Sequence, residues 1–212
     1  MPATNDLLLF ILSGLVLNIT PGADTLYIVS RATAQGPRVG AVAALGIGAG
    51  CVLHALAAAL GLSAVLAASA TAFDAVKWLG AAYLVYLGSW LLRRAPDAGP
   101  AVVDIPAPTW VGRVFIEGML TNLLNPKVAL FFLAFVPQFI DADTSSKPLT
   151  FLILGGIFIF NGTLWCLFVA WAAARFGAGI ARSRAWSAWL ARAGGALFIA
   201  LGIRLALTRP VA

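Results

Sequence analysis

Six long apolar segments, separated by short polar ones, make up almost all of this chain of 212 residues. A helix needs about 20 apolar residues to cross roughly 30 Å of hydrocarbon, and each segment reaches that length. The chain is 61% hydrophobic and 10% charged, with a mean hydropathy of +0.95, whereas soluble domains carry about 25% charged residues. These properties predict an all-α polytopic membrane protein with six transmembrane helices, near residues 6–30, 39–66, 72–92, 112–139, 149–174 and 187–207.

Several other classes of protein are disfavoured by the same sequence. The net charge is +6, but the basic residues stand in ones and twos between apolar runs, so nucleic-acid binding is not expected. No Lys or Arg precedes Arg31, and the first apolar run is long, so we expect a retained helix and not a cleaved signal peptide. Cys51 and Cys166 both fall inside predicted spans, which does not indicate a disulfide scaffold of the secreted type.

The basic residues lie mainly in alternate loops. By the positive-inside rule, the loops after spans one, three and five are cytoplasmic, and both termini are outside if all six segments cross. A five-span arrangement with one interfacial segment would move one terminus. The basic residues of the first set of loops are Arg31, Arg38, Arg93, Arg94, Arg113, Arg175, Arg182 and Arg184, and the other side holds little beyond Lys147 and Arg209.

The two halves of the chain resemble each other. A Pro- and Asp-containing cytoplasmic linker, 93–111, separates a first three-helix repeat, 1–92, from a second, 112–212. The segments 79–91 and 193–205 share glycine and Leu-Gly spacings, and Gly-x-x-x-Asn followed by proline occurs at 14–21 and at 118–126. Since each half holds an odd number of spans, the second copy enters the membrane from the other side. This predicts a 3+3 inverted repeat with broken first and fourth helices, an architecture typical of secondary transporters.

Both helix breaks are expected near the middle of the membrane. Eleven residues separate Leu7 from Asn18, about 16 Å at 1.5 Å per residue. Proline lacks an N–H, so Pro21 leaves the Leu17 carbonyl without a helical partner, and Pro126 does the same to that of Asn122. Unpaired backbone at that depth is tolerated only against protein or a wet cavity.

The residues around the breaks can recognise both ends of an amino acid. The half-helix after Pro21 presents free N–H groups and a positive dipole end, which suit a carboxylate. Carbonyl groups and Asp24 suit an ammonium. Lys127 should lie deep in the membrane, where a charge is costly and is by default a functional hypothesis. Simpler roles are compatible with the same residues: Pro21 and Gly22 could only ease packing, Asp24 and Lys127 could neutralise one another, and Lys127 could snorkel to the interface.

Four further polar residues are candidates for the functional site: His54 for proton coupling, and three secondary candidates. His54 ends a stripe of small residues and could relay protons, or could be bonded to a neighbouring helix. Glu117 lies one turn from Arg113, and we interpret the pair as mainly structural. Asn161 could join two helices or face a cavity. Arg31, which follows the first span, is the fourth.

Two motifs resemble a known family. N-I-T-P-G-A-D at 18–24 is followed by Arg31, Gly36, Gly40 and Gly46, and G-M-L-T-N-L-L-N-P-K-V-A-L-F-F-L-A-F-V-P-Q-F stands at 118–139. The chain resembles the LysE/RhtB family of amino-acid exporters over essentially its whole length. The family commonly has a second proline where this chain has Ala23, so the start of this half-helix could be less rigid here. The motif residues matched are Asn18, Pro21, Gly22, Asp24, Arg31, Asn122, Asn125, Pro126 and Lys127.

This resemblance implies a secondary transporter, not an enzyme, that exports amino acids from the bacterial cytoplasm through the inner membrane by exchange with protons. No cofactor, metal or catalytic residue is expected. The amino acid would bind at Asn18, Pro21, Gly22, Asp24, Asn122, Asn125, Pro126 and Lys127, and the small-residue stripes could also support a homo-oligomer.

In this hypothesis, the carboxylate of the amino acid binds near Lys127 and its ammonium near Asp24. Protonation of Asp24 or His54 would admit or release it. Because no second acid is expected deep in the membrane, a neutral or small polar amino acid is favoured, although Glu117 or backbone carbonyls could serve a cationic one. Two rival functions are a thiol redox carrier using Cys51 and Cys166, neither of which is expected beside the broken segments, and a passive channel or scaffold.

Overall fold

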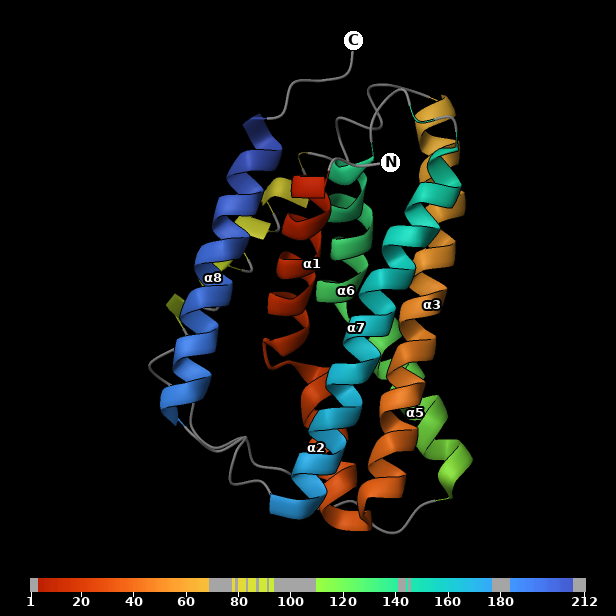
Figure 1. The fold of residues 1–212 in the computed structure, drawn as a ribbon, viewed down its shortest axis with the longest axis vertical. Helices are drawn as coiled ribbons and strands as arrows, with labels where there is room; N and C mark the ends of the chain where they lie inside the picture. Colours follow the sequence, from red (N-terminus) through yellow and green to blue (C-terminus); the bar gives the residue numbers. More distant parts are fainter. Residues whose placement is uncertain are drawn as a thin grey trace.

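The computed structural model describes residues 4–68, 78–93 apart from 79, 83, 87 and 91, 110–140, 144, 146–176 and 184–207. Within these residues every regular element is helical and none is a strand. The helices form an elongated bundle (Figure 1). The predicted class, an all-α polytopic membrane protein, is confirmed. Arg94, Arg182, Arg209, most of the linker 93–111 and part of the third predicted span lie outside the described residues.

The first predicted span is broken where the sequence places its proline. Helix α1 (Thr4–Ile19) and helix α2 (Ala23–Gln35) meet at an angle of 53°. The N–H of Thr20 still bonds the Val16 carbonyl at 3.0 Å, and Pro21 then ends the ladder because it has no N–H to donate. Gly22 precedes α2 in an extended conformation. Because glycine has no side chain, no N-cap side chain accepts a hydrogen bond from the first N–H groups of α2.

The fourth predicted span is broken in the same way. Helix α5 (Val111–Leu123) is followed by α6 (Pro126–Leu130), a π-helical turn η1 (Phe131–Phe135) and a 3-10 turn η2 (Val136–Phe139), with a bend of 51°. Here the start of α6 is capped, because the side-chain oxygen of Asn125 accepts the Lys127 N–H at 3.1 Å.

The two broken helices run in opposite directions. In Figure 1 the chain descends through α1 into α2 and later rises through α5 into α6, so that α2 and α5 share one end of the bundle and α1 and α6 the other. This arrangement agrees with an inverted repeat, although the division of the chain into two repeats remains a prediction.

Two continuous helices support the broken ones. Gly36, at a φ of +88°, ends α2 and turns the chain directly into α3 (Pro37–Ala68), a backbone conformation that favours glycine. Helix α7 (Lys147–Phe176) packs along α3. Glycines bring α3 and α5 together: a Cβ added at Gly118 would lie 2.7 Å from the Ala43 carbonyl oxygen, and one at Gly50 would lie 2.7 Å from that of Met119.

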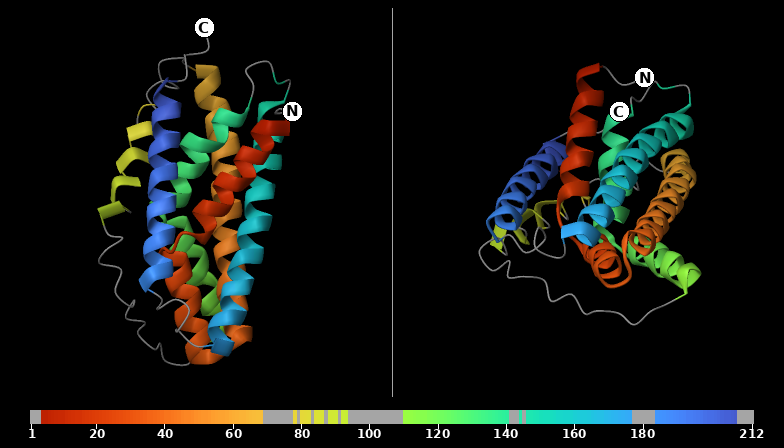
Figure 2. Two further views of the ribbon diagram at one scale, coloured as in Figure 1. Left: turned by 60° about the vertical axis from the view of Figure 1, so that its left-hand side comes forward. Right: turned by 60° about the horizontal axis from the view of Figure 1, so that its bottom comes forward.

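Helix α8 (Arg184–Leu207) lies at the edge of the bundle beside residues 78–93 (Figure 2). The contact is again made by small residues. A Cβ at Gly88 would lie 2.5 Å from the Gly195 carbonyl oxygen, and one at Gly202 would lie 2.9 Å from that of Ala81. The two segments that the sequence relates as repeats therefore pack against each other.

Only part of the predicted set of spans can be recognised among the described residues. Helices α3 and α7 are each long and apolar enough to cross a membrane, and each of the two bent pairs can count as one more, which gives up to four. Helix α8 is not among them, so the number of six spans remains a prediction.

Arginine residues gather at one end of the bundle. Helices α2 and α7 end toward the lower end of the bundle in Figure 1. Helices α3, α5 and α8 begin there. Among the described basic residues, these helix ends carry Arg31, Arg38, Arg113, Arg175 and Arg184.

Two apolar cores occupy opposite halves of the bundle. One is rich in phenylalanine and joins α1 to η1, η2 and α7, with the Phe131 and Phe158 rings 4.2 Å apart between centroids. The other joins α2, α3, α5 and α7 around Ile28 and Val114. A polar site lies between them, at the level of the two breaks.

Candidate functional site

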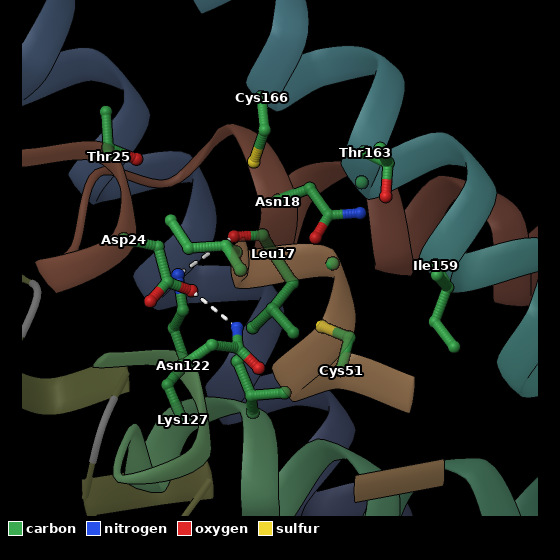
Figure 3. Close-up of a pocket in the computed structure, with 14 residues that line it drawn as sticks. Leu17, Asn18, Asp24, Thr25, Cys51, Asn122, Lys127, Ile159, Thr163 and Cys166 are labelled. Atoms are coloured by element: carbon green, nitrogen blue, oxygen red, sulfur yellow. Dashed lines mark hydrogen bonds between the residues drawn. The ribbon is translucent and has the colours of Figure 1, made fainter. Parts of the chain in front are cut away.

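A pocket opens at the two helix breaks, and all the helices around it contribute side chains. It leaves about 30 Å³ for the centres of water molecules, room for very few of them. The described residues that line it are Leu17, Asn18, Asp24, Thr25, Ile47, Gly48, Cys51, Asn122, Lys127, Val128, Ile159, Gly162, Thr163 and Cys166 (Figure 3).

Lys127 joins the second break to the first. Its ammonium donates to the carbonyl oxygen of Leu17 at 3.2 Å and to that of Thr20 at 3.1 Å. The Leu17 carbonyl is the group that Pro21 was predicted to free, and the lysine now takes the place of the missing N–H. Gly22 lies directly beside this ammonium, since a Cβ there would stand at an ordinary contact distance of 3.4 Å from the lysine nitrogen.

Asp24 is held by Asn122 from the other half of the chain. The side-chain amide of Asn122 donates to Asp24 Oδ2 at 2.9 Å. Among the described residues, no ion pair within 4.0 Å joins Asp24 to Lys127, although their charges interact. The two residues therefore do not form the contact ion pair that the alternative hypothesis envisaged.

Three polar atoms on pocket residues are buried without a hydrogen-bond partner: Asn18 Nδ2, Asp24 Oδ1 and Asn122 Oδ1. A buried polar group without a partner costs about 1–3 kcal/mol. One donor and two acceptors thus remain free for a bound molecule in the same small space.

His54 bonds the broken segment from outside the pocket. Its Nε2 lies 3.1 Å from the carbonyl oxygen of Asn122, and its ring stacks on Phe132 at 6.2 Å between centroids. Pro126 removes the helical partner of this carbonyl, as expected, but the Asn125 N–H bonds it at 2.9 Å, so it is not left unpaired. His54 does not line the pocket. This geometry matches the hypothesis that His54 is bonded to a neighbouring helix, while its part in proton transfer remains a prediction.

The remaining residues of the two motifs shape the helices around the pocket and do not line it. Asn125 is buried and caps α6, and the prolines at 21 and 126 set the breaks without lining the pocket. Asn161 lies on α7 beside a smaller hollow that it shares with Asn18, and not on the main pocket.

A polar cluster joins α2 to α5 at the arginine-rich end. Arg31 Nη2 lies 2.6 Å from Glu117 Oε2, and the hydroxyl of Tyr27 donates to Glu117 at 3.2 Å and to the Val114 carbonyl at 2.9 Å. Arg113 also bonds Glu117, at 2.8 Å across one helical turn, as the sequence predicted. Sequence reasoning missed Arg31 as the second partner, although the motif containing Arg31 was the available signal.

The two cysteines lie closer to the helix breaks than the sequence predicted. Neither was expected beside the broken segments, but both Cys51 on α3 and Cys166 on α7 line the pocket with Asp24 and Lys127, and their sulfur atoms point into it (Figure 3). Both are free thiols. The expectation was wrong because residues far from a break along the chain can still lie beside it when their helix packs against the broken one.

Other pocket residues were also missed from the sequence. Thr25, Gly48, Gly162 and Thr163 carry no charge and break no helix, so only the I-F-N-G-T-L-W run on α7 gave a polar signal near two of them. No group of three or more His, Cys, Asp or Glu in the described part of the chain could hold a metal ion.

Long apolar helices, two of them broken around a buried polar pocket, define a polytopic helical membrane transporter. The chain matches the LysE type translocator family over residues 15–209 and belongs to it. It is a transporter and not an enzyme.

Relatives of the chain are membrane proteins. An uncharacterised membrane protein of Pseudomonas aeruginosa is 32% identical over 210 residues, covering 95% of this chain and 94% of the relative. A leucine efflux protein of Salmonella typhimurium is 29% identical over 146 residues, 68% of each chain. No solved structure matches this chain.

Proposed function

We propose that this protein exports uncharged amino acids from the bacterial cytoplasm across the inner membrane in exchange for protons. Membership of the LysE type translocator family supports amino-acid export, as does the similarity to a leucine efflux protein. In this proposal the arginine-rich end of the bundle faces the cytoplasm, in accord with the positive-inside rule.

The observation that carries the proposal is the set of unpaired polar atoms in the pocket. An amino acid has an ammonium, which needs acceptors, and a carboxylate, which needs donors. Asp24 Oδ1 and Asn122 Oδ1 are free acceptors, and Asn18 Nδ2 is a free donor. The ammonium of Lys127 uses two of its three N–H groups on Leu17 and Thr20, so one remains for the carboxylate.

The lining also favours an uncharged side chain on the amino acid. Asp24 and Lys127 are the only charged residues among the described ones that line the pocket. In this arrangement Asp24 binds the ammonium of the substrate and Lys127 binds its carboxylate. A charged side chain would then be buried without a counter-charge, which is strongly unfavourable.

Proton exchange follows from competition at Asp24. A protonated carboxyl cannot neutralise a bound ammonium, so a proton and the amino acid would occupy Asp24 alternately. The pocket has no room for an amino acid in the conformation seen. Binding therefore requires the helices to move apart, either at the cluster of Arg31 and Glu117 or at the phenylalanine-rich core, as one half rocks against the other.

Counterflow in proteoliposomes tests this proposal directly. Purified protein in vesicles loaded with unlabelled leucine should accumulate labelled leucine, and an imposed pH gradient should drive accumulation without loaded substrate. Asp24→Asn should reduce pH-driven accumulation at least tenfold. Ser30→Ala is the control, because within the described part of the chain the Ser30 hydroxyl bonds only the Tyr27 carbonyl of its own helix, at 2.8 Å.

The possible outcomes separate the functions. If Asp24→Asn transports at the wild-type rate with the same pH dependence, Asp24 has no part in the mechanism. Counterflow without any pH-driven accumulation would indicate a carrier that is not coupled to protons, and pH-driven accumulation would exclude a passive channel. The position of two free thiols in one pocket makes a thiol redox carrier the second candidate, and a variant lacking both cysteines that still exports amino acids would exclude it.

A further inference from the structure

The lining of the pocket has two chemically different parts. Asn18, Asp24, Asn122 and Lys127 come from the broken helices and carry its amide and charged groups. The other part comes from the continuous helices α3 and α7 and includes Gly48, Cys51, Ile159, Gly162, Thr163 and Cys166. In Figure 3 Asp24 and Asn122 lie on one side of the space, Ile159 and Thr163 on the other, and both sulfur atoms point between them.

We propose that Cys51 and Cys166 form the subsite for the amino-acid side chain and determine the size of the uncharged side chain that is exported. This inference rests on the proposed function. If the ammonium and carboxylate bind the polar part of the pocket, the side chain lies against α3 and α7. Both thiols point into the space there, beside Ile159 and Thr163.

The subsite is narrow because α7 lies close to α3 at Gly48 and close to α1 at Gly162. A Cβ added at Gly48 would lie 3.0 Å from the Thr163 hydroxyl oxygen, and one at Gly162 would lie 3.0 Å from the Asn18 amide nitrogen. A larger residue at either position would therefore push a neighbouring side chain, Thr163 or Asn18, out of its place on the wall of the pocket. In the conformation seen, the pocket leaves about 30 Å³ for the centres of water molecules, and both cysteines form part of its wall. Removing either sulfur atom would therefore enlarge the space beside a bound side chain.

The chemistry of this part of the pocket selects for apolar side chains. A thiol behaves as a small hydrophobic group with a weak donor. Among the described residues of this part, none is charged, so a charged substrate side chain would lose its hydration without gaining a partner. In apolar pockets, one methylene group more or less changes the discrimination between substrates by roughly 10- to 200-fold.

The test compares the counterflow of leucine with that of alanine in proteoliposomes. Replacing Cys51 or Cys166 by alanine removes a sulfur atom from the subsite, so the ratio of leucine to alanine transport should rise by roughly tenfold. Gly48→Ala should lower that ratio. Gly156→Ala is the matched control on α7, because a Cβ there would meet nothing within 4 Å.

A second measurement needs no variant. In wild-type proteoliposomes, methyl methanethiosulfonate modifies accessible thiols, and mass spectrometry measures the modification of each cysteine. Leucine should slow the modification of both thiols at least threefold, whereas glycine, which has no side chain, should not.

Two results would overturn the subsite. One is a transport ratio within twofold of wild type in both active cysteine variants. The other is equal thiol modification in the presence of leucine, glycine or neither. By contrast, a wild-type protein that shows no counterflow of any amino acid would refute the proposed function itself.

Discussion

The ammonium of Lys127 donates to the Leu17 carbonyl oxygen at 3.2 Å, and so supplies the partner that Pro21 removes from the first broken helix. The same nitrogen bonds the Thr20 carbonyl at 3.1 Å. The second break also has a contact from another part of the chain, because the Asn122 carbonyl, which accepts the Asn125 N–H at 2.9 Å, lies 3.1 Å from the His54 ring nitrogen. Since Lys127 on the second broken helix bonds the first, movement of either one disturbs the other.

Replacing Lys127 by methionine tests this link. The methionine side chain has a similar length but no donor, so the carbonyl groups of Leu17 and Thr20 would lose their bonds to this side chain in the interior. An unpaired buried polar group costs about 1–3 kcal/mol, so we expect unfolding in detergent to become easier by about 2–4 kcal/mol. Lys147→Met, at the start of α7 and outside the pocket, is the control. Equal stability of the two variants would show that the bonds to Leu17 and Thr20 contribute little.

The sequence predicted the positions of the breaks but not the partners across them. Proline fixes where a helical ladder is interrupted, so Pro21 and Pro126 locate both breaks to within a residue or two. The rotation of each helix about its axis depends on packing with other helices. For this reason the sequence left open whether Lys127 would meet Asp24 directly, and the structure instead places it on Leu17 and Thr20.

The cysteines show the same limit of sequence reasoning. Cys51 lies on a continuous helix whose rotation is fixed by Gly46 and Gly50, where α3 touches the backbone of α5. That contact turns Cys51 toward the pocket. No property of the segment G-A-G-C-V-L-H on its own reveals which neighbour it will face.

Arg31 and Arg113 bind the same carboxylate, that of Glu117, but should contribute very differently to stability. The Arg31 side chain is 8% exposed and joins two helices, whereas that of Arg113 is 71% exposed and lies one turn from Glu117 on the same helix. Exposed pairs of the second kind contribute about 0.3–0.5 kcal/mol. Arg31→Gln should lower the free energy of unfolding by about 1–3 kcal/mol, and Arg113→Gln by less than about 0.5 kcal/mol. Chemical denaturation in detergent can measure both, and equal losses would contradict the assignment.

His54→Gln separates the structural part of His54 from proton transfer. Glutamine can donate a hydrogen bond toward the Asn122 carbonyl from a side-chain nitrogen, but it does not titrate. We expect pH-driven accumulation to stay within about threefold of wild type and to keep its dependence on pH, because proton exchange is assigned to Asp24. His54→Leu should lose stability, since it leaves the carbonyl without the ring nitrogen. A flattened pH profile for an otherwise active His54→Gln protein would transfer the proton-coupling role to His54.

Gly46→Ala should disrupt the support of the pocket without touching it. A Cβ at Gly46 would collide with the main-chain oxygen of Phe115 on α5, and main chain cannot move aside as a flexible side chain can. Helices α3 and α5 would have to separate, so we expect a loss of about 1–3 kcal/mol in the free energy of unfolding together with a loss of counterflow. Gly61→Ala is the matched control on the same helix, because a Cβ there would meet nothing within 4 Å, and it should leave stability unchanged or slightly improved, since alanine favours helix. If both variants unfold at the same denaturant concentration, the close contact between α3 and α5 does not hold the second broken helix in place.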